Sequence, residues 1–160
     1  MKYIEVSKRV RLTRDVSEDD LIKVMTERLH RAFDVSNIKE NDKGFNLQGT
    51  SGGGGKMMRH AAVDLNVQVV KQNEICRIMV CGTSKMSKSL VLVYSTLFFL
   101  VMLVGLLPGS IDTNGETSGA LDTLVLLIFG IFLFFDVNKK IEEPKDSILS
   151  ILDSLETEFG

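Results

Sequence analysis

Two long apolar runs restrict the folds open to this chain more than any other feature. Residues 90–107 contain no charged side chain, and residues 120–137 contain only Asp122 and Asp136, close to the two ends of the run. Each run has about 18 residues, or roughly 27 Å of helix, close to the thickness of a bilayer's hydrocarbon core. We therefore expect two transmembrane helices. The alternative, two buried core helices, would need more polar-faced partner surface than the rest of the 160 residues supplies.

The segment between the two runs predicts a tight helical hairpin. Residues 108–119 are rich in Gly, Ser, Asn and Pro, which favour turns, and their only charged side chains are acidic. Lys85 and Lys88 precede the first run, and Lys139 and Lys140 follow the second. Because positive charge marks the cytoplasmic side of a membrane, we expect a two-pass integral membrane protein with both termini cytoplasmic, in the inner membrane if the cell is bacterial.

The segments outside the two runs carry most of the charge and show regular periodicity. Residues 1–84 hold 14 Lys/Arg and 11 Asp/Glu, whereas residues 136–160 hold three Lys and seven acids. Ser17 begins a helix with Asp20 at its capping-box position, and the following apolar residues repeat every three to four positions. Alternating apolar and polar residues predict five strands, at residues 1–12, 35–40, 45–50, 60–70 and 75–83.

A second amphipathic helix follows the hairpin. Pro144 suits a first helical turn, and the apolar stripe consists of Ile148, Ile151, Leu152, Leu155 and Phe159. This helix has three candidate partners: the membrane, a second copy, or the predicted sheet. Its acidic polar face disfavours an anionic leaflet, so we prefer packing on the sheet.

These elements predict an α+β fold with an antiparallel sheet in β-α-β-β-β-β-α order, interrupted by the hairpin. We divide the chain into a cytoplasmic α+β part (residues 1–84), a transmembrane hairpin (residues 85–140) and a C-terminal helix (residues 141–160) that returns to the sheet. Over about 110 residues this order resembles the helix-grip arrangement of START-like lipid-binding domains and the saddle of TATA-binding proteins. The first resemblance implies a bound lipid between the sheet and the final helix.

Two short motifs resemble nucleotide sites but lack the residues that those sites need. Residues 85–89 read KMSKS, the signature of class I aminoacyl-tRNA synthetases, yet the partner motif and the nucleotide-binding sheet are missing. Gly52 to Gly55 with Lys56 resemble a phosphate-binding loop, but Thr50 and Met57 occupy positions that require Gly and Ser or Thr. We interpret the lysines of the first motif as a helix anchor and the glycines as a strand connection.

No pattern predicts catalysis or a bound metal. Cys76 and Cys81 are five residues apart on one strand, so they project from opposite faces, and we expect both to be buried, reduced thiols. His30 and His60 belong to different elements. The acidic pair Glu142 and Glu143 is expected at a helix start. We therefore expect no enzyme activity, no cofactor and no metal.

The basic residues are the only candidate binding residues. Lys8, Arg9, Arg11 and Arg14 form the densest basic stretch, with Arg9 and Arg11 on one polar strand face. Headgroup or phosphate contacts are predicted at six positions: Arg9, Arg11, Lys56, Arg59, Lys85 and Lys88. No aromatic residues interleave the basic stretch, so we expect no nucleic-acid partner.

Three functions fit these features. The preferred one is a membrane-anchored, non-enzymatic sensor or adaptor whose partners are the lipid bilayer and either another protein or a second copy. The second is a domain that takes a lipid or a small apolar ligand from the membrane. The third is an effector whose hairpins oligomerise and perturb the bilayer. The sequence does not distinguish the ligand, the partner or the oligomeric state.

Overall fold

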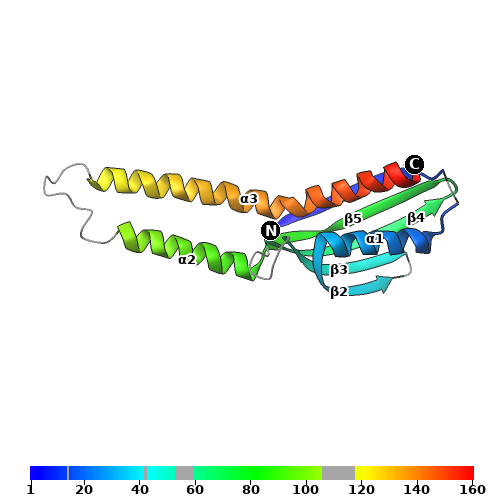
Figure 1. Cartoon of the computed structure of the whole chain (residues 1–160), viewed down its shortest axis with the longest axis horizontal. Helices are drawn as coiled ribbons and strands as arrows, with labels where there is room; N and C mark the ends of the chain where they lie inside the picture. Colours follow the sequence, from blue (N-terminus) through cyan, green and yellow to red (C-terminus); the bar gives the residue numbers. More distant parts are fainter. Residues whose placement is uncertain (14, 42, 53–59, 106–117) are drawn as a thin grey trace.

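The part of the chain that the structure describes forms a five-stranded antiparallel sheet and three helices. The computed structural model describes residues 1–13, 15–41, 43–52, 60–105 and 118–160, with only the backbone at 104, 105 and 118–125. The predicted α+β class with an antiparallel sheet is confirmed, and the strand order is β1-β5-β4-β3-β2 (Figure 1). In chain order the elements are β1 (Lys2–Arg11), α1 (Glu18–Ala32), β2 (Phe33–Asn41), β3 (Gly44–Ser51), β4 (Ala61–Gln72), β5 (Ile75–Met86), α2 (Lys88–Gly105) and α3 (Ser118–Phe159).

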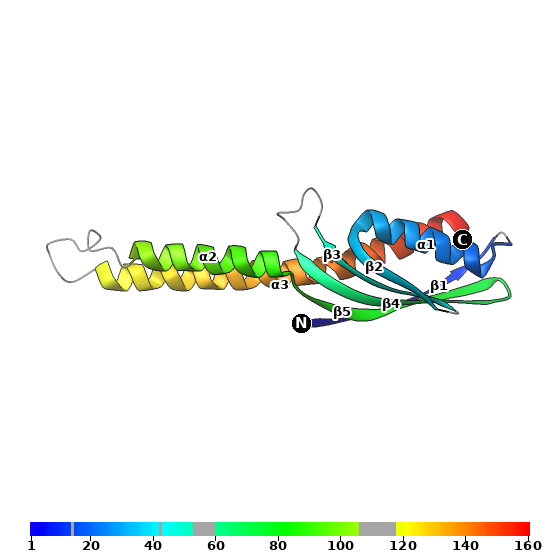
Figure 2. The same ribbon diagram turned by 90° about the horizontal axis from the view of Figure 1, so that it is seen from below.

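Most apolar residues of the strands point to one face of the sheet, whereas Tyr3, Val70, Ile75 and Met79 lie on the opposite face. Because side chains alternate along a strand, the apolar set of β4 is buried while Asp64 and Gln68 are exposed on the opposite face. Figure 2 shows α1 and the C-terminal part of α3 on the same face of the curved sheet. We call the opposite face, which neither helix covers, the open face.

Helix α1 begins where the capping pattern predicts. The Ser17 side chain caps the helix and accepts a hydrogen bond from the backbone N–H of Asp20 at 3.1 Å. Leu21, Met25 and Leu29 follow at intervals of four residues, and all three are buried against the sheet. The predicted cap and apolar face are confirmed.

Helix α3 is one continuous helix of 42 residues. The predicted break between residues 137 and 141 is therefore wrong, and Pro144 lies inside the helix rather than in its first turn. An internal proline removes one helical N–H donor and crowds the preceding turn. Pro144 removes the helical donor of the Lys140 carbonyl; one residue further on, the hydroxyl of buried Ser84 donates to the carbonyl of Ile141 at 2.8 Å and links this turn to β5.

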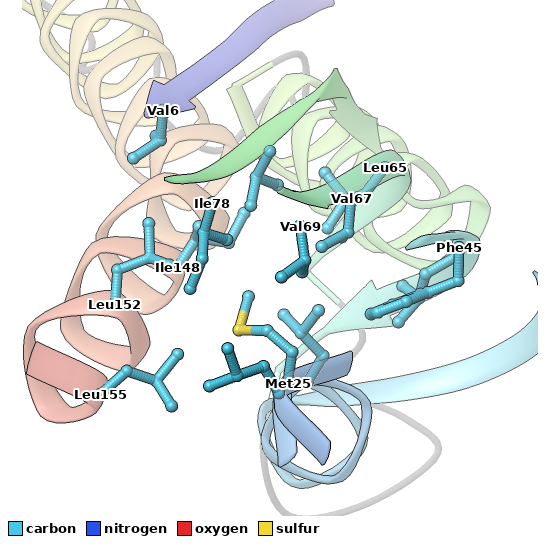
Figure 3. Packing of buried hydrophobic residues seen from close by; sticks show 14 of the residues in the cluster. Val6, Met25, Phe45, Leu65, Val67, Val69, Ile78, Ile148, Leu152 and Leu155 are labelled. Carbon is cyan, nitrogen blue, oxygen red and sulfur yellow. The ribbon is translucent and has the colours of Figure 1, made fainter. Parts of the chain in front are cut away.

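The C-terminal part of α3 contributes to the core between the helices and the sheet. Ile148, Leu152 and Leu155 are at most 1% exposed and belong to the same cluster as Met25 and Ile78 (Figure 3). Burying side chains of this size stabilises the fold by about 1.5–3 kcal/mol each. This packing joins the two ends of the chain in one hydrophobic core.

Ion pairs link Lys8 of β1 to two acidic side chains of α3. Lys8 projects to the helix side of the sheet, where its ammonium donates to Asp153 and contacts Glu156 at 2.6 Å. The hydrogen bonds to these two carboxylates raise the pKa of Lys8. Lys8 therefore points away from Arg9 and Arg11, its neighbours in the predicted basic stretch, which are exposed on the open face.

The predicted transmembrane hairpin is wrong. Within the described part of the chain, no helix combines the length and the apolar character needed to cross a membrane. Helix α2 has 18 residues and begins with Lys88, and α3 continues from its apolar part through Asp136 and Lys139. The two-pass topology, with an external loop and two cytoplasmic ends, is overturned by the same finding. Residues 108–117 of that loop lie outside the described residues.

Candidate functional site

The most unusual surface of the molecule lies on the part that projects beyond the sheet. We call the pair formed by α2 and the first part of α3, up to residue 140, the arm; its two helices run side by side away from the sheet (Figures 1 and 2). Fifteen of the nineteen exposed large apolar side chains among the described residues belong to it. They are Val91, Leu92, Val93, Leu97, Phe98, Phe99, Leu100, Met102 and Leu103 in α2, and Leu127, Ile128, Ile131, Phe132, Phe134 and Phe135 in α3.

The exposed side chains of α2 surround most of the helix. At about 100° per residue, three consecutive exposed positions such as residues 91–93 already span more than half of its circumference. The side facing α3 is narrow and includes Leu90, which is buried, and Tyr94 and Val101, which are half-buried. A helix that is apolar on all sides is normally covered on all sides. The arm thus presents a surface that one flat partner would not cover.

One polar contact ties the two helices of the arm together. The Tyr94 hydroxyl of α2 donates to the Asp136 carboxylate of α3, and Lys140 lies 3.8 Å from the same carboxylate oxygen. Burial raises the pKa of Tyr94 to about 12, and the hydrogen bond to Asp136 adds to the rise. The neutral phenol is therefore the form that holds α2 against α3.

We expect the ionisation of Tyr94 to report on this contact. A Tyr3→Phe variant leaves Tyr94 as the only tyrosine, and its ultraviolet absorbance should titrate with a midpoint near 12. Since the folded pKa is raised above the ordinary value of 10, the contact stabilises the fold below about pH 10, and this contribution is lost as pH rises through about 12. Adding Asp136→Asn should lower the midpoint, yet keep it above 10 because burial remains. Identical midpoints with and without Asp136 would contradict the contact.

Basic side chains collect at the base of the arm. Ser84 contacts Ile141, so Lys85 and Lys88, which follow Ser84, lie at the same level as Lys139 and Lys140, which precede Ile141. Lys85, Lys88 and Lys139 are exposed, whereas Lys140 pairs with Asp136. We call these four lysines the collar. The structure thus places Lys85 and Lys88 at the same end of the α+β domain as two lysines that were predicted only as topology signals, although Lys85, next to Ser84 on β5, projects to the face opposite α3.

The junction between the arm and the sheet contains contacts that the sequence did not suggest. His60, immediately before β4, lies with its Nδ1 2.8 Å from the Glu143 carboxylate, and Lys2 donates to Glu142. These acids are inside α3, so the predicted helix start at this pair is wrong. A hollow of about 360 Å³ lies beside them, lined by His60, Asp136, Lys139, Lys140, Glu143 and Asp146. The partners are 83 or more residues apart in the chain, and no local pattern could have paired them.

The remaining predicted binding residues lie elsewhere. Arg9 and Arg11 occupy the end of β1 on the open face, away from the arm, and Arg11 pairs with Glu74 at 3.3 Å. Lys56 and Arg59, like the glycine run from Gly53 onward, lie outside the described residues. The six predicted residues therefore do not form one site.

The two cysteines project to opposite faces of β5, as predicted. Both are free: Cys76 is buried in the core, whereas Cys81 is exposed, so the expectation that both are buried is wrong. Burial raises the pKa of the Cys76 thiol, which keeps it protonated. In the described ranges, no three His, Cys, Asp or Glu side chains are grouped in a way that could hold a metal ion.

Comparisons of the chain with protein-family models, with curated proteins and with solved structures found no match.

Proposed function

We propose that this chain is a non-enzymatic adaptor that attaches to a lipid surface through the arm and presents its α+β domain to a ligand or a protein. The observation that carries the proposal is the exposed apolar surface of the arm, which contains no ionisable side chain except Tyr94 over residues 89–103 and 126–135. Moving a half-exposed side chain of this size out of water is favourable by on the order of 1 kcal/mol. Fifteen such side chains supply a large driving force for attachment.

The shape and charge of the arm favour lipid over a protein partner as its cover. A protein surface covers one side of a helix pair, whereas lipid chains adapt to side chains pointing in every direction. The collar adds a complementary charge, because each lysine near an anionic lipid surface contributes about 1 kcal/mol of attraction. Attachment of this kind does not require a helix that crosses the bilayer.

One observation supports the non-enzymatic part of the proposal: the Cys76 thiol is buried in the core and stays protonated, so it is not available as a nucleophile. Turnover of a nucleotide or a lipid by the purified chain, with loss of activity on changing one polar residue, would contradict this part.

Vesicle flotation tests the attachment. The purified full chain, exchanged from mild detergent into phosphatidylcholine vesicles containing phosphatidylglycerol, should float with the vesicles. Leu100→Glu combined with Phe132→Glu adds two charges to exposed positions of the arm, and we expect the bound fraction to fall at least tenfold. The matched control is Leu149→Glu, a change at an exposed position of α3 that lies on the α+β domain, and it should float normally.

Two other results would overturn the lipid assignment. If the chain stayed in the aqueous fraction as a discrete oligomer, the arm would be covered by further copies of this chain. If the double Glu variant floated as well as the control, attachment would not involve the arm. Circular dichroism of each variant checks that the α+β domain is folded.

A further inference from the structure

A second surface, on the open face of the sheet, brings two positive charges together. Arg9 of β1 and Arg77 of β5 are direct partners in the antiparallel register, and both are exposed. The side chains of directly opposed strand residues start only about 5 Å apart, so like charges at such a pair destabilise a sheet. The fold therefore places two positively charged side chains at directly opposed positions of neighbouring strands.

The described residues do not neutralise this pair. Glu74, at the nearby β4–β5 turn, pairs with Arg11 at 3.3 Å, and no described carboxylate lies within ion-pair distance of Arg9 or Arg77. Arg77 donates from Nε to the Ser7 hydroxyl at 3.4 Å, a long contact with a neutral group. The terminal nitrogens of both arginines stay available as charged donors.

The two arginines share a hollow that accommodates a small ligand. Its volume is about 460 Å³, and its lining combines charged, amide and apolar side chains: Arg9, Arg77, Gln72, Asn73, Val70 and Met79. Asn73 sits at the tip of the β4–β5 turn with a φ of 56°, a left-handed conformation that asparagine tolerates. The two amides add neutral hydrogen-bonding groups beside the guanidinium pair.

We propose that this hollow binds a phosphate group, with Arg9 and Arg77 donating to its oxygens. Guanidinium groups bind phosphate through two parallel, charge-assisted hydrogen bonds, and a dianion would replace their mutual repulsion with attraction. The site is separate from the collar, because Lys85 lies eight residues along β5 from Arg77, or roughly 26 Å. The proposal therefore does not depend on attachment of the arm to lipid.

Calorimetric titration of the full chain with inorganic pyrophosphate at low salt tests the site. We expect saturable binding that Arg77→Gln weakens at least tenfold and that Arg77→Lys restores only in part, because lysine keeps the charge but not the two-pronged geometry. Arg31→Gln is the matched control: it removes one exposed positive charge from the last turn of α1 and should leave binding unchanged.

Thermal melting supplies a second measurement that does not depend on detecting weak binding heat. Without phosphate, Arg77→Gln should melt a few degrees above the unchanged chain because the cross-strand repulsion is gone. Pyrophosphate should raise the melting temperature of the unchanged chain and of Arg31→Gln, but not that of Arg77→Gln. Equal responses of Arg77→Gln and Arg31→Gln, or no binding to the unchanged chain, would overturn the proposal.

A competition experiment identifies the source of the phosphate. Vesicles bearing a phosphoinositide displace pyrophosphate if the site takes a lipid headgroup, whereas phosphatidylcholine vesicles do not. Retention of pyrophosphate in the presence of both vesicles identifies a soluble phosphate compound as the ligand. Both results support the site, since both require the pyrophosphate binding that Arg77→Gln removes.

Discussion

Leu152→Ala should lower the free energy of unfolding by about 2–5 kcal/mol. Leu152 is 0% exposed and lies in the core between α3 and the sheet, so removing its branched end leaves a cavity (Figure 3). Because α3 also forms half of the arm, the loss weakens the attachment of the arm to the domain. Denaturant unfolding followed by circular dichroism measures the change.

The control for this effect is three residues away in the same helix. Leu149 is 37% exposed and does not belong to the core cluster, so Leu149→Ala should change the free energy of unfolding by no more than about 0.5 kcal/mol. The two substitutions remove the same atoms from the same helix. Equal effects would mean that the C-terminal part of α3 does not pack on the sheet as described.

Gly82→Ala should destabilise the fold by about 2 kcal/mol or more, since overpacking at a rigid site costs about 1–3 kcal/mol. A Cβ added at Gly82 would lie 2.1 Å from the Asp64 carbonyl oxygen and 2.9 Å from the Leu65 Cα, both backbone atoms of β4. Because backbone atoms do not rotate away as a side chain does, β5 and β4 would have to separate at this point. Equilibrium unfolding of the variant measures the cost.

Gly130→Ala is the matching comparison, because we expect it to leave the stability of the fold unchanged or to raise it. Gly130 lies inside α3, where an added Cβ meets nothing within 4 Å. Alanine favours a helix over glycine by up to about 1 kcal/mol, so this variant should be as stable as the unchanged chain or more stable. If both variants lost stability equally, the close approach of β5 to β4 at Gly82 would be contradicted.

The strands and the first helix were predicted correctly because the sequence signals that mark them are local. Alternation predicted five strands, and the spacing of Leu21, Met25 and Leu29 predicted the buried face of α1. Ser17 and Asp20 predicted its first turn. Each of these signals involves residues within a few positions of one another, so the sequence alone was sufficient.

The errors concern one helix boundary and the two apolar runs. Pro144 and the acidic pair beside it are typical of a helix start, yet α3 continues through them, and Ser84 of β5 contacts this turn at the Ile141 carbonyl. The two apolar runs were interpreted as membrane spans from their length, their lack of central charge and the lysines that flank them. Among the described residues, no helix has both the length and the apolar character needed to cross a membrane.

Each candidate site also has a part that the sequence predicted and a part that only the tertiary structure showed. Alternation along β1 placed Arg9 on a polar face, but only the pairing of β1 with β5 placed Arg77, 68 residues further along the chain, opposite it. The sequence showed that the arm contains long stretches without charge. That most of their side chains are exposed follows from the tertiary structure, because only a narrow side of α2 contacts α3. Periodicity is a property of neighbouring residues, and so the sequence determined which face of each element is apolar. Which elements meet depends on contacts between distant residues, and this only the tertiary structure decided.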